Sequence, residues 1–430
     1  MERYVQIKDS GVDWIREIPN TWCVRALFQL VEQVKNKNKN LIERNLLSLS
    51  YGKIKRKDIN NPEGLLPESF DGYNIIEAND IVLRLTDLQN DHTSLRVGQA
   101  KERGIITSAY ITLRPANIVN PQFLYYVLHA YDLIKGFYGM GSGVRQGLNF
   151  DEVKAIRVPF PPVSEQSAIV DYLDDQISQI DSIIAEAKTS IEEYKQWKAS
   201  IIFETVTKGL DANVEMRNSG TEFGSVPNNW QVIRLKNIAC EIFKGNGITK
   251  EDIVEDGDTF CVRYGEIYSK YNFFFEHCLT KTNKNRVVAQ RYFSYGDILF
   301  AGTGELVEEI GKGIVYIGND VCLAGGDIIV VKHTQNPVFM AYALNSNYIQ
   351  IQKSRNKAKL KVVHISSADI GSLIVFLPPI EEQTIIADYL KKKCSIIDSV
   401  IKEKEDLIGD LDQYKRSLIY EVVTGKRKVV

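Results

Sequence analysis

Two long stretches of the chain carry apolar residues at alternating spacings of three and four. Such a narrow stripe is typical of a long helix that packs against one other helix. A Pro-Pro pair precedes each stretch, and Gly209 and Gly425 follow them, as expected at helix starts and ends. We expect long helices within 161–209 and 378–430, each roughly 66 Å long. The predicted seam residues are Leu173, Ile177, Ile180, Ile184, Ile191, Leu390, Ile397, Ile401, Ile408 and Leu411.

The two stretches are copies of one another. Pro161-Pro162-Val163-Ser164-Glu165-Gln166 recurs as Pro378-Pro379-Ile380-Glu381-Glu382-Gln383, and 22 of 47 positions are identical at a constant offset of 217 without a gap. A weaker repeat lies upstream of each stretch, near the start of each variable block, where Ser10 to Trp22 resembles Ser219 to Trp230. The chain therefore reads as variable block, helix, variable block, helix, with boundaries at 1–160, 161–209, 210–377 and 378–430.

Each helix offers the other a matching apolar stripe. The simplest solution is an intramolecular antiparallel coiled coil with pseudo-two-fold symmetry, which we expect here. The alternative is that each helix packs only on its own variable block, although a helix on a domain core usually shows a wider apolar face. Lys198 occupies the one polar position of the first stripe.

The variable blocks are predicted to be mixed α/β domains, so the fold class is α+β. Short runs rich in Ile, Val and Leu lie between Gly, Asn and Asp turn residues, and they predict strands. We expect helices at 121–135 and 337–353. The clearest predicted strands are at 80–85, 110–114, 297–300, 313–317 and 327–331.

Composition indicates a globular chain without a catalytic signature. Of the 430 residues, 44% are hydrophobic and 25% are charged. The six cysteines lack metal-ligand spacing, and no apolar run is long enough for a membrane span. We find no P-loop, no Gly-rich methyl-donor turn and no nucleophile constellation. We therefore expect a cytoplasmic recognition or scaffold protein, not an enzyme, with no metal and no cofactor of its own.

Local basic segments are candidates for DNA contact, although the net charge is only −2. One lies at 53–57 and another at 353–361. A Gly-rich segment at 141–149 lies shortly before the first Pro-Pro pair, and the segment at 353–361 lies at the corresponding position before the second pair. For one cluster alone, a solvated surface is an equal alternative. The predicted DNA-binding residues are Lys53, Lys55, Arg56, Lys57, Arg84, Arg145, Gln146, Arg263, Lys353, Arg355, Lys357, Lys359 and Lys361.

These motifs resemble the specificity subunits of type I restriction–modification systems. The resemblance rests on Ser10 to Trp22, on the two Pro-Pro-x-x-Glu-Gln motifs that open long helices, and on the phrases at 84–91 and 104–110. It covers nearly the whole chain. One departure is Phe223, which stands where the family usually has Trp.

The resemblance implies a division of labour. Each variable block would be a target-recognition domain for one half of a bipartite, asymmetric double-stranded DNA target, and the helices would set the gap and dock two modification subunits. Those partners would bind S-adenosylmethionine, and restriction subunits would supply ATP- and Mg-dependent translocation and cleavage. Two alternatives stay open: the recognition subunit of a related modification or phage-defence system, and a coiled-coil scaffold without DNA binding.

Overall fold

The computed structural model describes residues 3–60, 69–140, 147–287, 289–304, 310–355 and 363–429. The chain divides into two compact units, one formed by Met1–Ala187 with Glu405–Val430 and the other by Lys188–Lys404. Each unit therefore contains one variable block and a part of each long helix. Both predicted helices are present, as α3 (Val163–Lys208, 46 residues) and α8 (Ile380–Val423, 44 residues).

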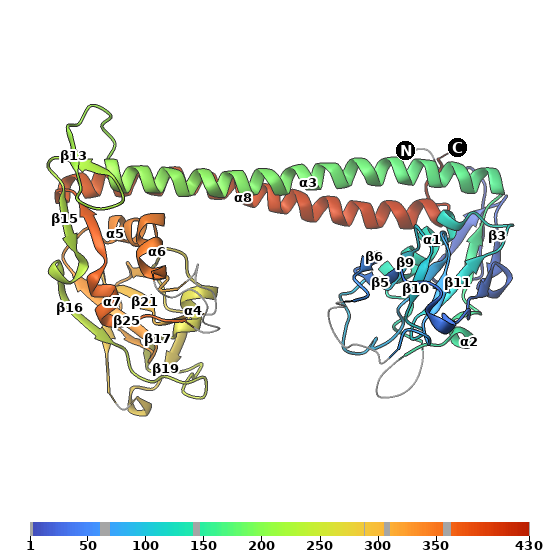
Figure 1. The fold of residues 1–430 in the computed structure, drawn as a ribbon, viewed down its shortest axis with the longest axis horizontal. Helices are drawn as coiled ribbons and strands as arrows, with labels where there is room; N and C mark the ends of the chain where they lie inside the picture. The colour runs from blue at the N-terminus through green and yellow to red at the C-terminus, as the bar shows by residue number, and fades with distance from the viewer. Residues whose placement is uncertain are drawn as a thin grey trace. The chain divides into compact units, whose positions relative to one another are not determined.

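The first unit contains two four-stranded sheets (Figure 1). One has the order β4-β11-β8-β9 and is antiparallel, and the other has the order β6-β5-β10-β7 with a parallel β5–β10 pair. Two small antiparallel pairs, β1–β2 and β3–β12, complete it. The bounds are β1 Ile7–Asp9, β2 Glu17–Pro19, β3 Cys23–Ala26, β4 Val31–Gln33, β5 Leu46–Ser50, β6 Lys53–Lys57, β7 Asn74–Ile76, β8 Ile81–Leu83, β9 Val97–Gln99, β10 Gly104–Ile106, β11 Ile111–Pro115, α1 Pro121–Leu133, α2 Phe150–Val153 and β12 Arg157–Phe160.

The second unit repeats this topology with one added strand, β18. Its sheets have the orders β16-β25-β21-β23-β18 and β19-β17-β24-β20. The β17–β24 pair is parallel, as β5–β10 is, and β18 pairs in parallel with β23. The bounds are β13 Met216–Asn218, β14 Ser225–Pro227, β15 Gln231–Arg234, β16 Ala239–Lys244, β17 Thr259–Val262, α4 Tyr264–Ser269, β18 Phe274–Phe275, β19 Thr280–Thr282, β20 Tyr292–Phe293, β21 Ile298–Ala301, β22 Thr303–Gly304, β23 Gly313–Tyr316, β24 Cys322–Ala324, β25 Ile328–His333, α5 Pro337–Leu344, α6 Asn347–Ser354, β26 Val363–His364, α7 Ser367–Ser372 and β27 Ile374–Leu377.

The predicted strands correspond to β8, β11, β21, β23 and β25, and the helix predicted at 121–135 is α1. The helix predicted at 337–353 is interrupted, because the Asn345 amide donates to the carbonyls of Ala341 and Gly313 and ends α5. Ser346 then begins α6. Gly209 and Gly425 both have a positive φ, 77° and 72° respectively. This is the left-handed conformation that favours glycine after a helix.

The two helices are antiparallel partners in both units. In the first unit, the seam residues Leu173, Ile180 and Ile184 share one apolar cluster with Leu418 and Val422. In the second unit, Ile202 and Val206 share a cluster with Ile386, Leu390 and Cys394. Both clusters also include residues of the variable block, so each helix packs on its partner and on a domain core. The predicted antiparallel coiled coil is confirmed, and Figure 1 shows α3 in green beside α8 in red.

Two equivalent ion pairs join the helices at polar positions of the seam. The Lys415 ammonium lies 2.6 Å from Asp181 Oδ1, and the Lys198 ammonium lies 2.7 Å from Asp398 Oδ1. Lys198 and Lys415 occupy the same position in the two copies of the repeat, and so do Asp181 and Asp398. Because a polar residue in an apolar seam disfavours other alignments, these pairs define the register of the coiled coil.

The repeated motif joins each helix to the variable block that precedes it. Glu165 accepts a hydrogen bond of 2.9 Å from the Trp22 indole, and Glu382 accepts one of 3.0 Å from Trp230. These four residues explain why the Trp and Glu recur together. Phe223, where the family usually has Trp, anchors its segment by an edge-on contact with Tyr348, with the ring centroids 5.5 Å apart. Edge-on packing is a favourable arrangement for two aromatic rings.

The glutamine of the motif connects three elements in each unit. Gln166 is buried, donates to the Pro161 carbonyl at 2.9 Å and accepts from the backbone N–H of Asn120, the N-cap of α1. Gln383 makes the same contacts to Pro378 and to Asn336, the N-cap of α5. The motif therefore fixes the start of the long helix against its domain.

The seam ion pairs lead to a prediction about helix register. Asp398→Lys places two ammonium groups side by side and should lower the unfolding free energy by about 1 kcal/mol. The exchanged pair Lys198→Asp with Asp398→Lys should regain most of that loss. Urea unfolding measures both effects, and Glu403→Lys is the control, as a charge reversal at an exposed position of α8. An equal loss in the control, without recovery in the exchanged pair, would contradict a role in register.

Candidate nucleic-acid interface

The basic segment at 53–57 forms β6, the edge strand of its sheet. Because side chains alternate along a strand, Lys53, Lys55 and Lys57 share one face, and all three are exposed. Arg56 lies on the other face and forms an ion pair with Glu102, in which the guanidinium holds the pKa of the carboxyl below its usual range. The strand therefore presents a row of three exposed lysines.

The end of the Gly-rich segment, residues 147–149, is described in the first unit and lies next to Leu85. Arg145 and Gln146 fall outside the described residues. The next described part of the segment is attached where the Leu148 backbone N–H donates to the Leu85 carbonyl at 2.8 Å. Arg84, which precedes Leu85, is half-buried, and its backbone N–H donates to the Arg96 carbonyl.

The second unit has the same attachment. The Ile365 backbone N–H donates to the Gly302 carbonyl at 2.9 Å, and both residues lie 217 positions after their counterparts Leu148 and Leu85. Asn149 and Ser366, also 217 apart, then cap α2 and α7 with equivalent capping boxes. The described residues that follow the two predicted loops are thus structurally equivalent, although the sequences around them differ.

Lys353 corrects the prediction for the second basic segment. Its side chain is 2% exposed and donates to the carbonyls of Gly311 and Leu344, so it is enclosed by the domain and not placed to meet DNA. Burial lowers its pKa to about 7. Arg355 is exposed and forms an ion pair with Glu222. Lys357, Lys359 and Lys361 lie outside the described residues.

Arg263 has a local structural role. It precedes α4 as the N-cap residue and is half-buried, and its backbone N–H donates to Glu266 at 2.9 Å. Its guanidinium lies 3.9 Å from the Glu266 carboxylate. Arg263 therefore stabilises the start of α4, which gives no specific support to a DNA contact.

A cavity of about 470 Å³, lined mainly by polar residues, lies beside Gly302 and Ile365 in the second unit. Sequence reasoning missed it. Thr303 Oγ1 and His364 Nδ1 are 3.0 Å apart there, and Lys244 pairs with Asp327 at 3.1 Å. The Gly-Thr-Gly run at 302–304 looks like a turn in sequence but contributes β22, which pairs with β26. The constant offset of 217 between Leu85 and Gly302 is the signal that could have located this site.

Two kinds of feature are missing from the part of the chain that the structure describes. Within that part, no group of His, Cys, Asp and Glu side chains is arranged to bind a metal ion, and no helix has the length and apolarity to cross a bilayer. His129 and His333 are half-buried, and desolvation lowers the pKa of each to about 4. Both side chains are therefore neutral at physiological pH.

Comparisons with known proteins agree with the fold and the repeat. The family described as type I restriction modification DNA specificity domain matches residues 19–193 and 227–407. The chain is 24% identical to a putative type I restriction enzyme MjaX specificity subunit of Methanocaldococcus jannaschii, over 96% of both chains. It is 25% identical to the MjaVIII specificity subunit of the same organism, over 83% of this chain and 80% of the relative.

Solved structures share the fold. One from work on assembly and conformational transition of the type I R-M system superposes with a TM-score of 0.70 at 13% identity, over 94% of this chain and 98% of the other. The HsdS subunit from Thermoanaerobacter tengcongensis gives a TM-score of 0.51 at 14% identity, over 95% and 98%. With two matched copies of the family domain and the same repeated topology, the chain belongs to the DNA specificity subunits of type I restriction–modification systems.

Proposed function

We propose that each unit of this specificity subunit reads one half of a bipartite, asymmetric DNA target. The proposal rests on a repeated topology in which different side chains occupy equivalent positions of the two units. Leu148 and Leu85 in the first unit correspond to Ile365 and Gly302 in the second, and the sequences beside these two pairs differ. Two domains that share a topology but differ in their surfaces are suited to recognise two different half-sites.

The long helices would act as spacer and as dock. A seam with a defined register makes the gap between half-sites a geometric property of the chain. Both helices also expose large apolar residues, including Trp197 (52% exposed) and Ile396 (54% exposed). Isolated exposed apolar groups are common, but several on one helix pair favour contact with a protein partner. We assign this surface to two modification subunits.

Catalysis would then belong to the partners. Modification subunits would hold S-adenosylmethionine and methylate the target, while restriction subunits would use ATP and Mg. Under this proposal the chain itself is non-catalytic and works in the cytoplasm, where its DNA target is. The comparisons give no support to a DNA-free scaffold or to a different defence system over this function.

Methylome sequencing of the host tests the proposed function directly. With the gene present, methylation should occur at one bipartite motif with a fixed gap, and deletion of the gene alone should abolish it while other methylated motifs persist. Reintroducing the gene should restore the motif. Methylation that is identical with and without the gene would contradict the proposal.

The lysine row of β6 leads to a second prediction. In the complex with modification subunits, replacing Lys53, Lys55 and Lys57 with Ala should weaken DNA binding equally for all sequences. The slope of log affinity against log salt should fall by roughly 0.9 for each lost phosphate contact. Gel shifts across a salt series measure this slope. Ala at Lys8, Lys236 and Lys270, three exposed lysines outside β6, removes the same charge and should leave most of the slope. Equal slopes for both triple variants would exclude a particular role for β6.

The spacer role can be tested by helix length. Adding seven residues to both helices at their midpoints keeps the heptad seam and lengthens each by about 10 Å. At about 34 Å per 10 bp of duplex, the preferred gap should grow by about 3 bp, with both half-site sequences unchanged. Methylome sequencing reads the new gap. A gap that stays the same in a folded variant would mean that the helices are not the spacer.

A further inference from the structure

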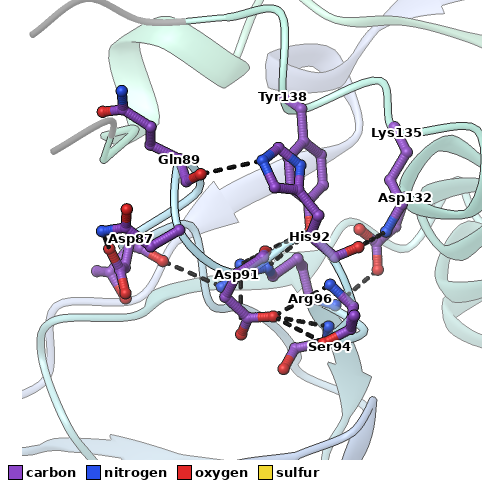
Figure 2. Close-up of polar contacts among 12 residues, drawn as sticks. Asp87, Gln89, Asp91, His92, Ser94, Arg96, Asp132, Lys135 and Tyr138 are labelled. Atoms are coloured by element: carbon purple, nitrogen blue, oxygen red, sulfur yellow. Dashed lines mark hydrogen bonds and ion pairs between the residues drawn. The ribbon is translucent and has the colours of Figure 1, made fainter. Parts of the chain in front are cut away.

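The connection between β8 and β9 is held from inside the first unit by one buried arginine (Figure 2). Arg96 is completely buried, and its Nη1 donates to the Thr86 carbonyl at 3.0 Å. Its Nη2 donates to the Asp91 carbonyl, and its Nε donates to the Tyr138 hydroxyl at 3.2 Å. A buried guanidinium is unfavourable unless its donors are satisfied, so this arginine binds the connection, residues 86–94, to the domain interior.

On its inner side, the connection is held by hydrogen bonds and an ion pair of Asp91. Its carboxylate accepts backbone N–H bonds from Thr93 at 3.1 Å and Ser94 at 2.9 Å, and it lies 3.5 Å from Arg96 Nη2. The hydrogen bonds from Ser94 contribute most to a pKa of Asp91 well below its usual range. Its charge is therefore balanced by groups within the unit.

The second unit has a lysine at the equivalent place. The Arg96 carbonyl accepts from the Arg84 N–H at 2.9 Å, and the Lys312 carbonyl accepts from the Ala301 N–H at 3.0 Å, so Lys312 is the counterpart of Arg96. The Lys312 ammonium donates to the Tyr271 carbonyl at 2.7 Å. The two units therefore share the backbone contact and differ in the side chain placed there.

The outer side of the connection is ordered around Gln89. The Gln89 carbonyl contacts His92 Nε2 at 3.0 Å, and the His92 ring stacks on Tyr138 with the centroids 5.2 Å apart. Lys135 donates to the His92 carbonyl at 2.6 Å. His92 therefore holds the Gln89 carbonyl and is itself held by Tyr138 and Lys135, while Arg96 binds the connection on both sides of Gln89, at Thr86 and Asp91.

The Gln89 side chain itself is exposed and makes no hydrogen bond to any other residue that the structure describes. Figure 2 shows it pointing away from the Asp91–Arg96 cluster. By contrast, the neighbouring Asn90 amide donates to Asp87 at 2.7 Å. The connection starts next to Leu85, where the end of the Gly-rich segment is attached. Gln89 thus combines a fixed backbone with a carboxamide that is available to a ligand.

We propose that Gln89 is a base-reading residue of the first unit, recognising an adenine in one half-site, and that Arg96 is the residue that positions it. A carboxamide can accept from N6 and donate to N7 of adenine in the major groove, a pair of bonds that no other base edge offers in the same pattern. A connection that is already ordered loses little conformational freedom on binding. This inference rests on the proposed function and names one residue that carries the sequence preference.

The test uses the complex of the full chain with its modification subunits. Binding is measured by competition against duplexes that carry every single-base change in both half-sites. Gln89→Ala should reduce discrimination at one adenine position of one half-site by about five- to hundredfold, with all other positions unchanged. Gln6→Ala, another exposed glutamine of the same unit, is the matched control and should keep every preference.

Other outcomes decide against the inference. Unchanged discrimination by Gln89→Ala at every position would overturn it, and so would a uniform loss across all duplexes, which would indicate a backbone or protein contact. Arg96→Lys keeps the positive charge but loses the planar guanidinium with its several donors. This variant should weaken discrimination only at the adenine position that Gln89→Ala affects. If the unaltered complex shows no preference for any bipartite duplex, the proposed function fails, and this result is distinct from a failure of the Gln89 inference.

Discussion

The structure depends on covering two narrow apolar stripes. Neither α3 nor α8 could keep its seam exposed to water, and each carries the heptad pattern that matches the other. An antiparallel pair buries both stripes, and the two lysine–aspartate pairs select one register. Because the four charged residues repeat at the same offset as the apolar ones, the same contact is made in both units.

The Pro-Pro-x-x-Glu-Gln motif attaches each long helix to its recognition domain. Glu165 binds Trp22, and Gln166 binds the N-cap of α1, so the first turn of the helix is attached to two parts of the domain at once. Glu382 and Gln383 do the same in the second unit. The side chains that differ between units lie elsewhere, on β6, on the β8–β9 connection and around the cavity beside β22. A fixed frame with variable surfaces is what a protein needs if its target changes while its assembly does not.

The sequence predicted the features that depend on the heptad periodicity and on the identity between the two copies of the repeat. The helices, their seam and their pairing follow from the heptad pattern and the offset of 217, and the main strands follow from short runs of β-branched residues. The common topology of the two variable blocks was missed, because it is carried by strand register and not by identical residues. Lys353 was misjudged because its carbonyl partners, Gly311 and Leu344, come from other elements. Arg96 was missed for the same reason, since its partners extend from Thr86 to Tyr138.

The central proposal is that two copies of one frame, joined by an antiparallel helix pair, carry interchangeable readers. The most direct measurement is the methylome of a host whose subunit carries residues 27–156 of the first variable block a second time, in place of residues 235–373 of the second block. The two segments lie between equivalent framing strands, β3 and β12 in the first unit and β15 and β27 in the second. The account predicts methylation at an inverted repeat of one half-site with the original gap. A direct repeat of that half-site, or a different gap, would contradict it.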